Sequence, residues 1–487
     1  MEANLFITLS MMIPFLVSIL NLVMKKNANS RDFVAFIGSI LTFLCVLKIF
    51  IDVGNTITKE IVLLSILPNL KIAFHVEPLG LVFALLASGL WVFTHIYAIG
   101  YMRENNEKNH SRFFACFSLA IGCVIGIAFS SNMFTLFFFY EALTLTTYPL
   151  VAHKGSKDAI RGARTYFGIL IGTSIGFQLT AIIWTFLMVD TLDFSRGGIL
   201  NGHIDGFLAI ILMFLYIFGI GKAAIMPFHR WLPAAMVAPT PVSALLHAVA
   251  VVKAGVFTVV KVSIYIFGLD WLQNSGASYW IMWLAAFTII IASVIALTKD
   301  NLKARLAYST ISQLSYIILG ASLATSIGIL GASTHIVMHA MGKITLFMCA
   351  GSIYVATQKT NISEMKGLGR VMPITFGAFL LGSLSIIGLP PFGGSWSKWL
   401  LLSGALDFDQ WFMVIILIIS SILNVAYLMP IVAKGFFLSE NNYVNSKYSE
   451  SSFFIWLPPA LTGLGCIILF FIAGNIVEFL NPIVLVE

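Results

Sequence analysis

Long apolar runs, rather than short alternating ones, dominate the hydrophobic pattern of this chain. An α-helix needs about 20 apolar residues to cross the hydrocarbon core of a bilayer, whereas strands of a membrane β-barrel alternate over about ten. The runs do not alternate, so the pattern predicts an all-α polytopic membrane protein with about 14 transmembrane helices. The expected spans are 4–24, 32–52, 78–100, 113–130, 132–152, 164–188, 207–237, 240–267, 279–298, 305–325, 327–356, 371–402, 411–434 and 453–480.

Composition and charge agree with this pattern. Hydrophobic residues make up 59% of the chain and charged residues 10%, against about 25% charged in soluble domains. The net charge of +7 does not indicate nucleic acid, because almost every loop Lys and Arg follows an odd-numbered span. Loops after even-numbered spans hold only Lys59, Lys71 and Arg196. The positive-inside rule then places both termini on the outer side, and we expect the chain to lie among the lipids of a prokaryotic cytoplasmic (inner) membrane.

Cofactor-binding patterns are missing from the sequence. The cysteines lie inside expected spans without a C-x-x-C pair, which is typical of small apolar packing residues. There is no G-x-G-x-x-G and no phosphate-binding loop. We therefore expect no cofactor, no metal, no disulfide and no redox catalysis in this chain. The cysteines are Cys45, Cys116, Cys123, Cys349 and Cys466.

Ionisable residues inside the spans are the candidate functional groups. Each costs on the order of 3 kcal/mol at the centre of a bilayer, and together they cost roughly as much as the 5–15 kcal/mol net stability of a protein. Lysines far outnumber the one acid, so ion pairing cannot satisfy them all. Burial favours the neutral form of an unpaired lysine, and a lysine poised between its two forms can carry a proton. These residues are Glu141, Lys222, Lys253, Lys261, Lys343 and Lys398.

Histidines add to this set, most clearly in span 327–356. His335, His339 and Lys343 are four residues apart, which places them on one stripe of a helix about 6 Å apart per step. Such a stripe predicts a proton wire. Two histidines four apart can also bind zinc, but the glutamate and third ligand of a zinc helix are missing. For His95 and for Lys261, near a helix end, a structural role is the favoured interpretation.

Two overlong spans are broken by proline and glycine next to a lysine. The first break combines Lys222 with Pro227, and the second combines Pro390, Pro391 and Lys398. Proline removes a backbone hydrogen bond and opens a helix, and non-helical backbone at membrane depth lines a cavity or is buried in protein.

Interrupted helices at corresponding positions of two halves indicate inverted repeats. The fourth to eighth spans (113–268) and the ninth to thirteenth (279–434) are the expected repeats, with discontinuous seventh and twelfth helices. Residues 1–112 then form peripheral helices, and 435–487 form a loop and the last helix.

His247 and Lys253 lie in one span but six residues apart. Their side chains then point about 120° apart on a regular helix. They reach one proton path only if the helix is distorted, so the pattern leaves open whether they share it.

The motifs around these residues resemble one family: the antiporter-like subunits shared by respiratory complex I, Mrp-type multi-subunit sodium/proton antiporters and membrane-bound hydrogenases. The resemblance covers roughly residues 75–435. It is carried by 139–141 (FYE), 221–224 (GKAA), 231–236 (WLPAAM), 238–248 (APTPVSALLHA), 252–255 (VKAG), 300–313 (DNLKARLAYSTISQ) and the His335/His339/Lys343 helix.

This resemblance implies a fourteen-helix core with two inverted five-helix repeats and a hydrophilic axis along the membrane midplane. It assigns proton-translocation roles in a fixed order: Glu141 paired with Lys222, then His247 and Lys253, then His335, His339 and Lys343, and finally Lys398. Lys303, at the start of a helix, becomes a candidate relay. The implied function is a proton-translocating subunit of a complex with other membrane subunits.

Two other functions stay open at this point: a self-standing secondary transporter for a cation or solute, and a scaffold that only packs redox partners. Inert packing would use leucine rather than a row of lysines, which argues against the scaffold. Exchange of H⁺ for Na⁺ is a further alternative. Sodium prefers oxygen ligands, and Glu141 is the only deeply placed carboxylate, so protons are the expected ion.

Overall fold

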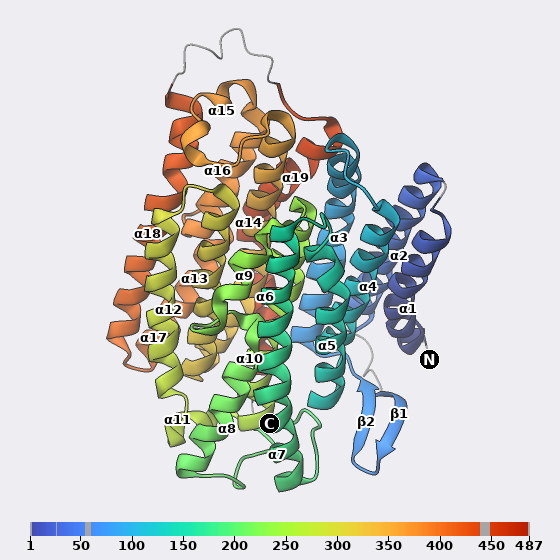
Figure 1. Cartoon of the computed structure of the whole chain (residues 1–487). Coiled ribbons are helices and arrows are strands. Elements are labelled where there is room, and N and C mark those ends of the chain that lie inside the picture. Colours follow the sequence, from blue (N-terminus) through green and yellow to red (C-terminus); the bar gives the residue numbers. More distant parts are fainter. Residues whose placement is uncertain (1, 26, 54–59, 439–448, 486–487) are drawn as a thin grey trace.

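The structure, a computed structural model, describes residues 2–25, 27–53, 60–438 and 449–485, and in these residues it is a bundle of long helices (Figure 1). Lys26, Lys59 and Lys447, which enter the loop-charge argument, lie outside the described residues. The long α-helices are α1 (Glu2–Val23), α2 (Ala28–Val53), α3 (Pro78–Glu104), α4 (His110–Ala128), α5 (Met133–Val151), α6 (Lys157–Thr173), α7 (Leu179–Val189), α8 (Gly206–Gly219), α10 (Val251–Lys261), α12 (Tyr279–Thr298), α13 (Leu302–Leu323), α14 (Ser326–Thr357), α16 (Pro373–Ile387), α17 (Gly394–Asp407), α18 (Trp411–Phe437) and α19 (Phe453–Leu480).

Shorter elements connect or interrupt these helices. They are β1 (Ile61–Leu67), β2 (Leu70–Phe74), α9 (Trp231–Ala234), α11 (Leu269–Ser275) and α15 (Leu368–Val371), the 3₁₀ turns η2 (Gly221–Ala223), η3 (Phe228–Arg230), η4 (Ala235–Val237), η7 (Ile362–Glu364) and η8 (Asn481–Ile483), and the π-helical turns η1 (Ser174–Gln178), η5 (Val242–Ala250) and η6 (Val262–Phe267).

The helical membrane architecture expected from the sequence is confirmed. Among the described residues, 12 helical segments are long and apolar enough to cross a membrane. The two spans expected to be broken contain the shorter apolar helices α8 and α16 instead. Helix α6 begins at Lys157, seven residues before the expected start, because Ser156 caps it by accepting a hydrogen bond from the Ala159 amide at 3.2 Å. The count of fourteen crossings and the two repeats remain predictions.

An antiparallel hairpin of β1 and β2 is the element that the helical pattern does not predict. Its two strands are joined at Pro68 and Asn69, residues that favour turns. Most of β1 is exposed apolar surface. The hairpin lies at the end of the bundle opposite α15 (Figure 1).

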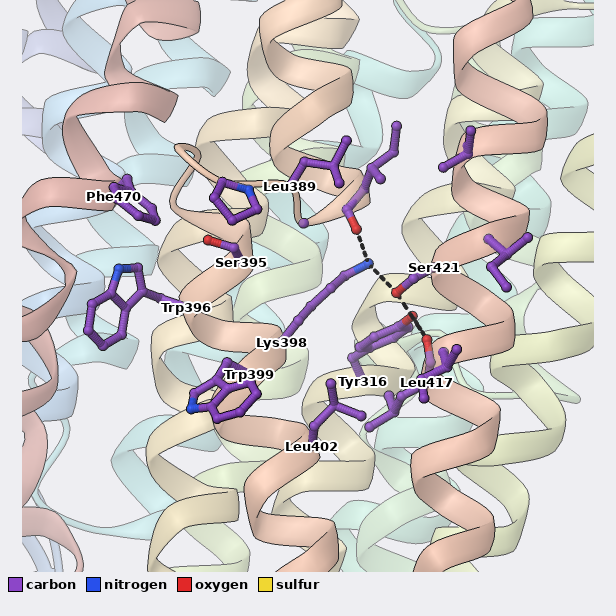
Figure 2. A pocket seen from close by; sticks show the side chains of 16 residues that line it. Tyr316, Leu389, Ser395, Trp396, Lys398, Trp399, Leu402, Leu417, Ser421 and Phe470 are labelled. Carbon is purple, nitrogen blue, oxygen red and sulfur yellow. Dashed lines mark hydrogen bonds between the residues drawn. The ribbon is translucent and has the colours of Figure 1, made fainter.

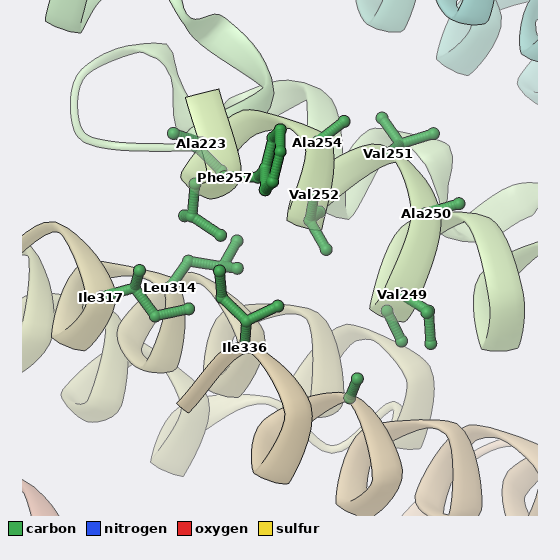
Figure 3. Packing of buried hydrophobic residues seen from close by; sticks show 14 of the residues in the cluster. Ala223, Val249, Ala250, Val251, Val252, Ala254, Phe257, Leu314, Ile317 and Ile336 are labelled. Carbon is green, nitrogen blue, oxygen red and sulfur yellow. The ribbon is translucent and has the colours of Figure 1, made fainter. Parts of the chain in front are cut away.

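Helices α10, α13 and α14 form the middle of the bundle, and their side chains are almost entirely buried. Small and β-branched side chains of α10 pack over Leu314 and Ile317 of α13 and Ile336 of α14 (Figure 3). Helix α14 contacts α13, α16, α17 and α19 as well as η5. Helices α1, α2, α18 and α19 have exposed apolar faces, as expected for the lipid-facing periphery.

Candidate functional site

Both expected helix breaks are present. Helix α8 ends at Gly219, and the chain passes through η2 and Pro227 before α9 begins at Trp231. Helix α16 ends at Ile387, and α17 begins at Gly394, after the two prolines.

The first break is packed directly against α10 at Gly255. A Cβ added to Gly255 would lie 2.3 Å from the backbone of Lys222 and Ala223. Only a glycine allows this approach of two backbones. The contact places Lys222 next to the helix that carries Lys253.

Lys222 lies in η2 and is fully buried. Its Nζ donates to the Tyr140 carbonyl oxygen at 2.7 Å and to Thr144 Oγ1 at 2.6 Å, and lies 3.2 Å from the centre of the Tyr140 ring. All three partners belong to α5. Neutral oxygens and an aromatic face therefore surround the ammonium group.

Glu141 follows Tyr140 on α5, but it does not form the expected direct ion pair with Lys222. No contact within 4.0 Å joins their charged atoms, and both carboxylate oxygens are buried without a hydrogen-bond partner among the described residues. The lysine instead binds the carbonyl of the residue next to the acid. The Lys222 ammonium group thus lies beside α5, at the residue before Glu141, without a direct contact to the carboxylate.

Lys253 connects the first half of the molecule to the second. Its Nζ lies 2.6 Å from His339 Nδ1, across the contact between α10 and α14. Both side chains are buried. This contact joins two titratable groups, one from each of the two predicted repeats.

His247 lies in η5, one of two π-helical stretches that flank α10. Its ring packs 6.0 Å from that of Tyr166 and 6.3 Å from that of Trp231, and neither ring nitrogen has a partner among the described residues. The helix is thus distorted between His247 and Lys253, and the two side chains contact different groups. π-Bulges are frequent at functional sites.

The histidine stripe of α14 continues from His339, the partner of Lys253, to His335. The rings of His335 and His339 are stacked with centroids 5.7 Å apart, and His335 stacks in turn on Tyr316 at 5.6 Å. His335 Nδ1 lies 2.8 Å from Ser397 Oγ on α17, next to Lys398. The stripe therefore reaches the second helix break.

Lys343, one turn beyond His339, points to α13. Its Nζ donates to Ser309 Oγ at 2.5 Å, and Ser309 lies 2.8 Å from the Tyr427 hydroxyl. Tyr427 donates to Asn424 on the same helix, α18. This branch is a chain of hydroxyl groups rather than of charges.

Lys398 lies at an apolar cavity of about 670 Å³ between α16, α17 and α18 (Figure 2). Its Nζ donates to the Ile387 carbonyl oxygen at 2.9 Å and to Ser421 Oγ at 3.0 Å. In Figure 2 the side chain points away from Trp396 toward Ser421. The Ile387 carbonyl is free to accept this bond because Ile387 is the last residue of α16, where the helix is broken.

The remaining candidates lie away from this set. Lys303 donates to the Ala238 carbonyl oxygen at 2.7 Å, at a second cavity of about 200 Å³. Lys261 forms an ion pair with Glu77 at 2.8 Å. His95 is buried among aromatic rings, 4.9 Å from that of Phe114, as expected for a packing residue.

We call the eight principal candidates the ionisable row: Glu141, Lys222, His247, Lys253, His335, His339, Lys343 and Lys398. The four lysines of the row are 0–7% exposed, which confirms their expected burial. Buried polar atoms in folded proteins are paired with protein or with ordered water. The unpartnered atoms of Glu141 and His247 and the outer ring nitrogens of His335 and His339 are therefore sites for bridging water.

Hydroxyl groups are the functional candidates that sequence reasoning missed. Thr144, Ser309, Ser397 and Ser421 each contact a member of the row. Serine and threonine also satisfy their own helix carbonyls within apolar spans, so their presence in the sequence carries no signal. Their partners on other helices become visible only in the fold. Among the described residues, no cluster of three or more potential ligand side chains could hold a metal.

These features define a polytopic α-helical membrane protein with a row of buried ionisable side chains that extends from one broken helix to the other. Residues 130–424 match the family described as NADH:quinone oxidoreductase/Mrp antiporter, TM, and residues 67–114 match the one described as NADH-Ubiquinone oxidoreductase (complex I), chain 5 N-terminus. The chain belongs to the NADH:quinone oxidoreductase/Mrp antiporter family.

Relatives and solved structures agree with this assignment. The chain is 29% identical over 378 residues to NADH-quinone oxidoreductase subunit N of Desulforudis audaxviator, covering 76% of this chain and 74% of that one. It is 33% identical over 395 residues to the chloroplastic NAD(P)H-quinone oxidoreductase subunit 5 of Mesostigma viride, covering 76% and 58%. The match thus spans little more than half of that longer relative.

Among solved structures, the Mrp complex from Dietzia sp. DQ12-45-1b contains a chain with the same fold, at a TM-score of 0.86 and 18% identity, covering 99% of this chain and 97% of that one. A chain of respiratory complex I from Thermus thermophilus gives a TM-score of 0.83 at 20% identity, with 98% of both chains covered. These neighbours belong to multi-subunit membrane complexes.

Proposed function

We propose that this chain is a proton-translocating, antiporter-like subunit of a multi-subunit membrane complex, and that the ionisable row carries the protons. The observation that carries the proposal is the 2.6 Å contact between Lys253 and His339. It brings one buried ionisable group of the predicted first half into direct contact with one of the predicted second half. Both the family and the fold neighbours support a role inside a larger assembly.

The row can move protons by successive charge separation. When Lys222 is protonated, the nearby Glu141 carboxylate stabilises it across the α5 backbone. A charge arriving at Glu141 weakens this stabilisation and favours proton transfer toward Lys253. From there His339 and His335 lead to Ser397 and Lys398, with water bridging the unpartnered ring nitrogens. Lys303, with its own cavity, is proposed as a relay on the side toward Ala238.

Protons are the proposed ion. Sodium binds best to several oxygen ligands, and the row offers one carboxylate. Exchange with sodium then requires oxygen ligands on a partner subunit. The charge bias of the loops supports a cytoplasmic membrane location with both termini outside. A redox reaction, if the complex has one, belongs to other subunits.

The decisive experiment measures proton flux in membrane vesicles that hold the complete complex. Lys222→Ala and Glu141→Gln should each lower flux at least tenfold while the complex still assembles. Phe138→Leu is the matched control, because Phe138 is an exposed apolar residue on the same helix, α5. Wild-type flux in both row variants would overturn the proposal. Full activity of the isolated chain in liposomes would instead indicate a self-standing transporter.

A further inference from the structure

A small polar cavity lies outside the ionisable row, at the end of the bundle that carries the hairpin. It has a volume of about 180 Å³ and ends at Lys261 on α10. It lies among the ends of α4, α7 and α10, which sequence reasoning places on the outer side of the membrane. Nothing in the proposed row explains why this cavity is lined with charges.

The charges of the cavity follow one another from the surface inward. At its mouth, Lys71 pairs with Glu60 at 2.8 Å and with Asp193 at 3.1 Å, and these side chains are 24–48% exposed. At its base, Lys261 pairs with Glu77 at 2.8 Å, with the two side chains 1% and 14% exposed. The outer group of Lys71, Glu60 and Asp193 is therefore partly exposed to solvent, whereas the inner pair of Lys261 and Glu77 lies largely buried at the base of the cavity.

Lys261 of the inner pair lies on the same helix as Lys253 of the row, whereas Glu77 immediately precedes α3. Lys261 follows Lys253 by eight residues on α10, or about 12 Å along the helix. Its Nζ also donates to the Ser130 carbonyl oxygen at 3.1 Å. The Phe194 ring covers the ammonium group, with its centre 3.9 Å from Nζ. Phe194 and Lys261 thus both line the cavity, with the aromatic ring against the ammonium group.

We propose that this cavity is an aqueous proton port for the first half of the row, with Glu77 and Lys261 as its terminal exchange pair and Phe194 as its cover. The inference rests on the proposed function. A buried ion pair gives little net stability, so fold stability alone does not account for it. The cavity at Lys303 is reached from loops at the opposite end, which would leave the row with one port on each side.

The exchange step conserves charge and protons. A proton from cavity water binds the Glu77 carboxylate and removes the negative charge that holds Lys261. Lys261 then transfers its own proton toward Lys253 through water and becomes neutral. The proton on Glu77 moves to Lys261, which restores the ion pair. One proton enters and one leaves, and the reverse sequence releases a proton.

Blocking the port with a label tests the proposal. Ser131 lines the cavity, and Ser131→Cys replaces one oxygen by sulfur. Vesicles that hold the complete complex, with the hairpin side outward, are treated with a membrane-impermeant, positively charged thiol reagent. Ser195→Cys is the control: Ser195 is exposed one residue after Phe194 and does not line the cavity. Treated wild type, with its five native cysteines, is the reference.

Labelled Ser131→Cys should lose at least four-fifths of its flux, while Ser195→Cys labelled to the same extent should keep it. Equal flux in both would overturn the port. If Ser131→Cys does not assemble, Phe194→Cys carries the label at the same place, and Lys261→Met should lower flux without a label. Lys222→Ala is measured in parallel. If flux survives Lys222→Ala, the proposed function fails; if only the label has no effect, the port alone fails.

Discussion

The two broken helices hold their lysines in similar ways. Lys222 and Lys398 each donate to one backbone carbonyl and one hydroxyl group. Each also lies over a tyrosine ring, Tyr140 at 3.2 Å and Tyr316 at 5.1 Å. In the expected repeats these tyrosines belong to corresponding helices. The shared environment supports the predicted repeat, although the two halves show no obvious sequence identity.

The breaks differ in what lies beside the lysine. Lys222 is fully enclosed, and Glu141 follows its tyrosine along the chain. Lys398 borders the open apolar cavity, and Ile317 follows its tyrosine. The first half thus carries its own counter-charge. The second half has no carboxylate at the corresponding position, so in the proposed mechanism its charge comes from the histidine stripe or from a group outside the chain.

The largest expected effect is a loss of stability in a variant that pushes the first helix break away from α10. Gly255→Ala places a Cβ 2.3 Å from the Lys222 and Ala223 backbone, and such overpacking typically costs about 1–3 kcal/mol. We expect the high end of this range, because backbone atoms cannot move aside as a side chain does. Thermal unfolding of the purified complex and the yield of assembled complex measure it.

Gly377→Ala in α16 is the control for the second half, because a Cβ there meets nothing within 4 Å. It should be neutral, or stabilising by up to about 1 kcal/mol from helix propensity. Equal stability of the Gly255 and Gly377 variants would show that the two backbones separate easily.

A smaller effect should distinguish the two hydroxyl partners. Thr144→Val removes a 2.6 Å hydrogen bond from the enclosed Lys222, and bonds to charged groups contribute about 1.5–3 kcal/mol. Flux should fall roughly tenfold or more, since 1.4 kcal/mol is a factor of ten. Ser421→Ala removes a longer bond, 3.0 Å, from Lys398, which is 7% exposed and keeps its bond to the Ile387 carbonyl oxygen. Its flux should fall less than about threefold.

The comparison is made on initial rates of proton uptake at matched amounts of complex. Leu145→Ala, an exposed apolar change one residue after Thr144, serves as the control. A larger loss in Ser421→Ala than in Thr144→Val would reverse the proposed roles of the two breaks.

The sequence predicts the spans and the breaks because both depend on local chemistry. Long apolar runs define the helices, and proline removes hydrogen bonds wherever it lies. The His335, His339 and Lys343 stripe is equally local. The Lys253–His339 contact is not, because it joins residues 86 apart in the sequence. Its existence depends on how α10 packs against α14.

Three features of the structure are not predicted by the sequence, each for a different reason. The family resemblance implies a direct Glu141–Lys222 pair, but in the fold the lysine donates to uncharged oxygens of α5 instead. The hairpin is a short apolar segment next to long apolar helices, so hydropathy does not distinguish it. A lysine near a helix end can reach water, so the sequence favours a structural role for Lys261. Only the fold shows the cavity above it.

The smallest expected effect concerns the stability of the β1–β2 hairpin, where Lys71 pairs with Glu60 and Asp193 at the mouth of the cavity that ends at Lys261. Partial burial opposes the charge on Lys71, but Glu60 and Asp193 outweigh it and raise the Lys71 pKa. Burial likewise opposes the charge on Glu60, but hydrogen bonds from Lys71 and Ser131 lower the Glu60 pKa. The stabilisation that Glu60 gives to the folded hairpin is therefore complete above the ordinary glutamate pKa of about 4.3. It is lost as the pH falls through the lowered pKa of Glu60 in the folded protein.

Stabilisation by Lys71 is full below its ordinary pKa of about 10.4 and is lost as the pH rises through its raised value. Hydrogen exchange of the β2 amides, corrected for the intrinsic rate, should therefore be constant from about pH 5 to pH 10 and rise below about pH 4. Lys71→Met should raise exchange modestly at neutral pH, because a partly exposed pair contributes at most about 1 kcal/mol, and should flatten the acid step. An unchanged acid step in Lys71→Met would mean that another carboxylate fixes the hairpin, so the mouth of the cavity would not depend on this pair.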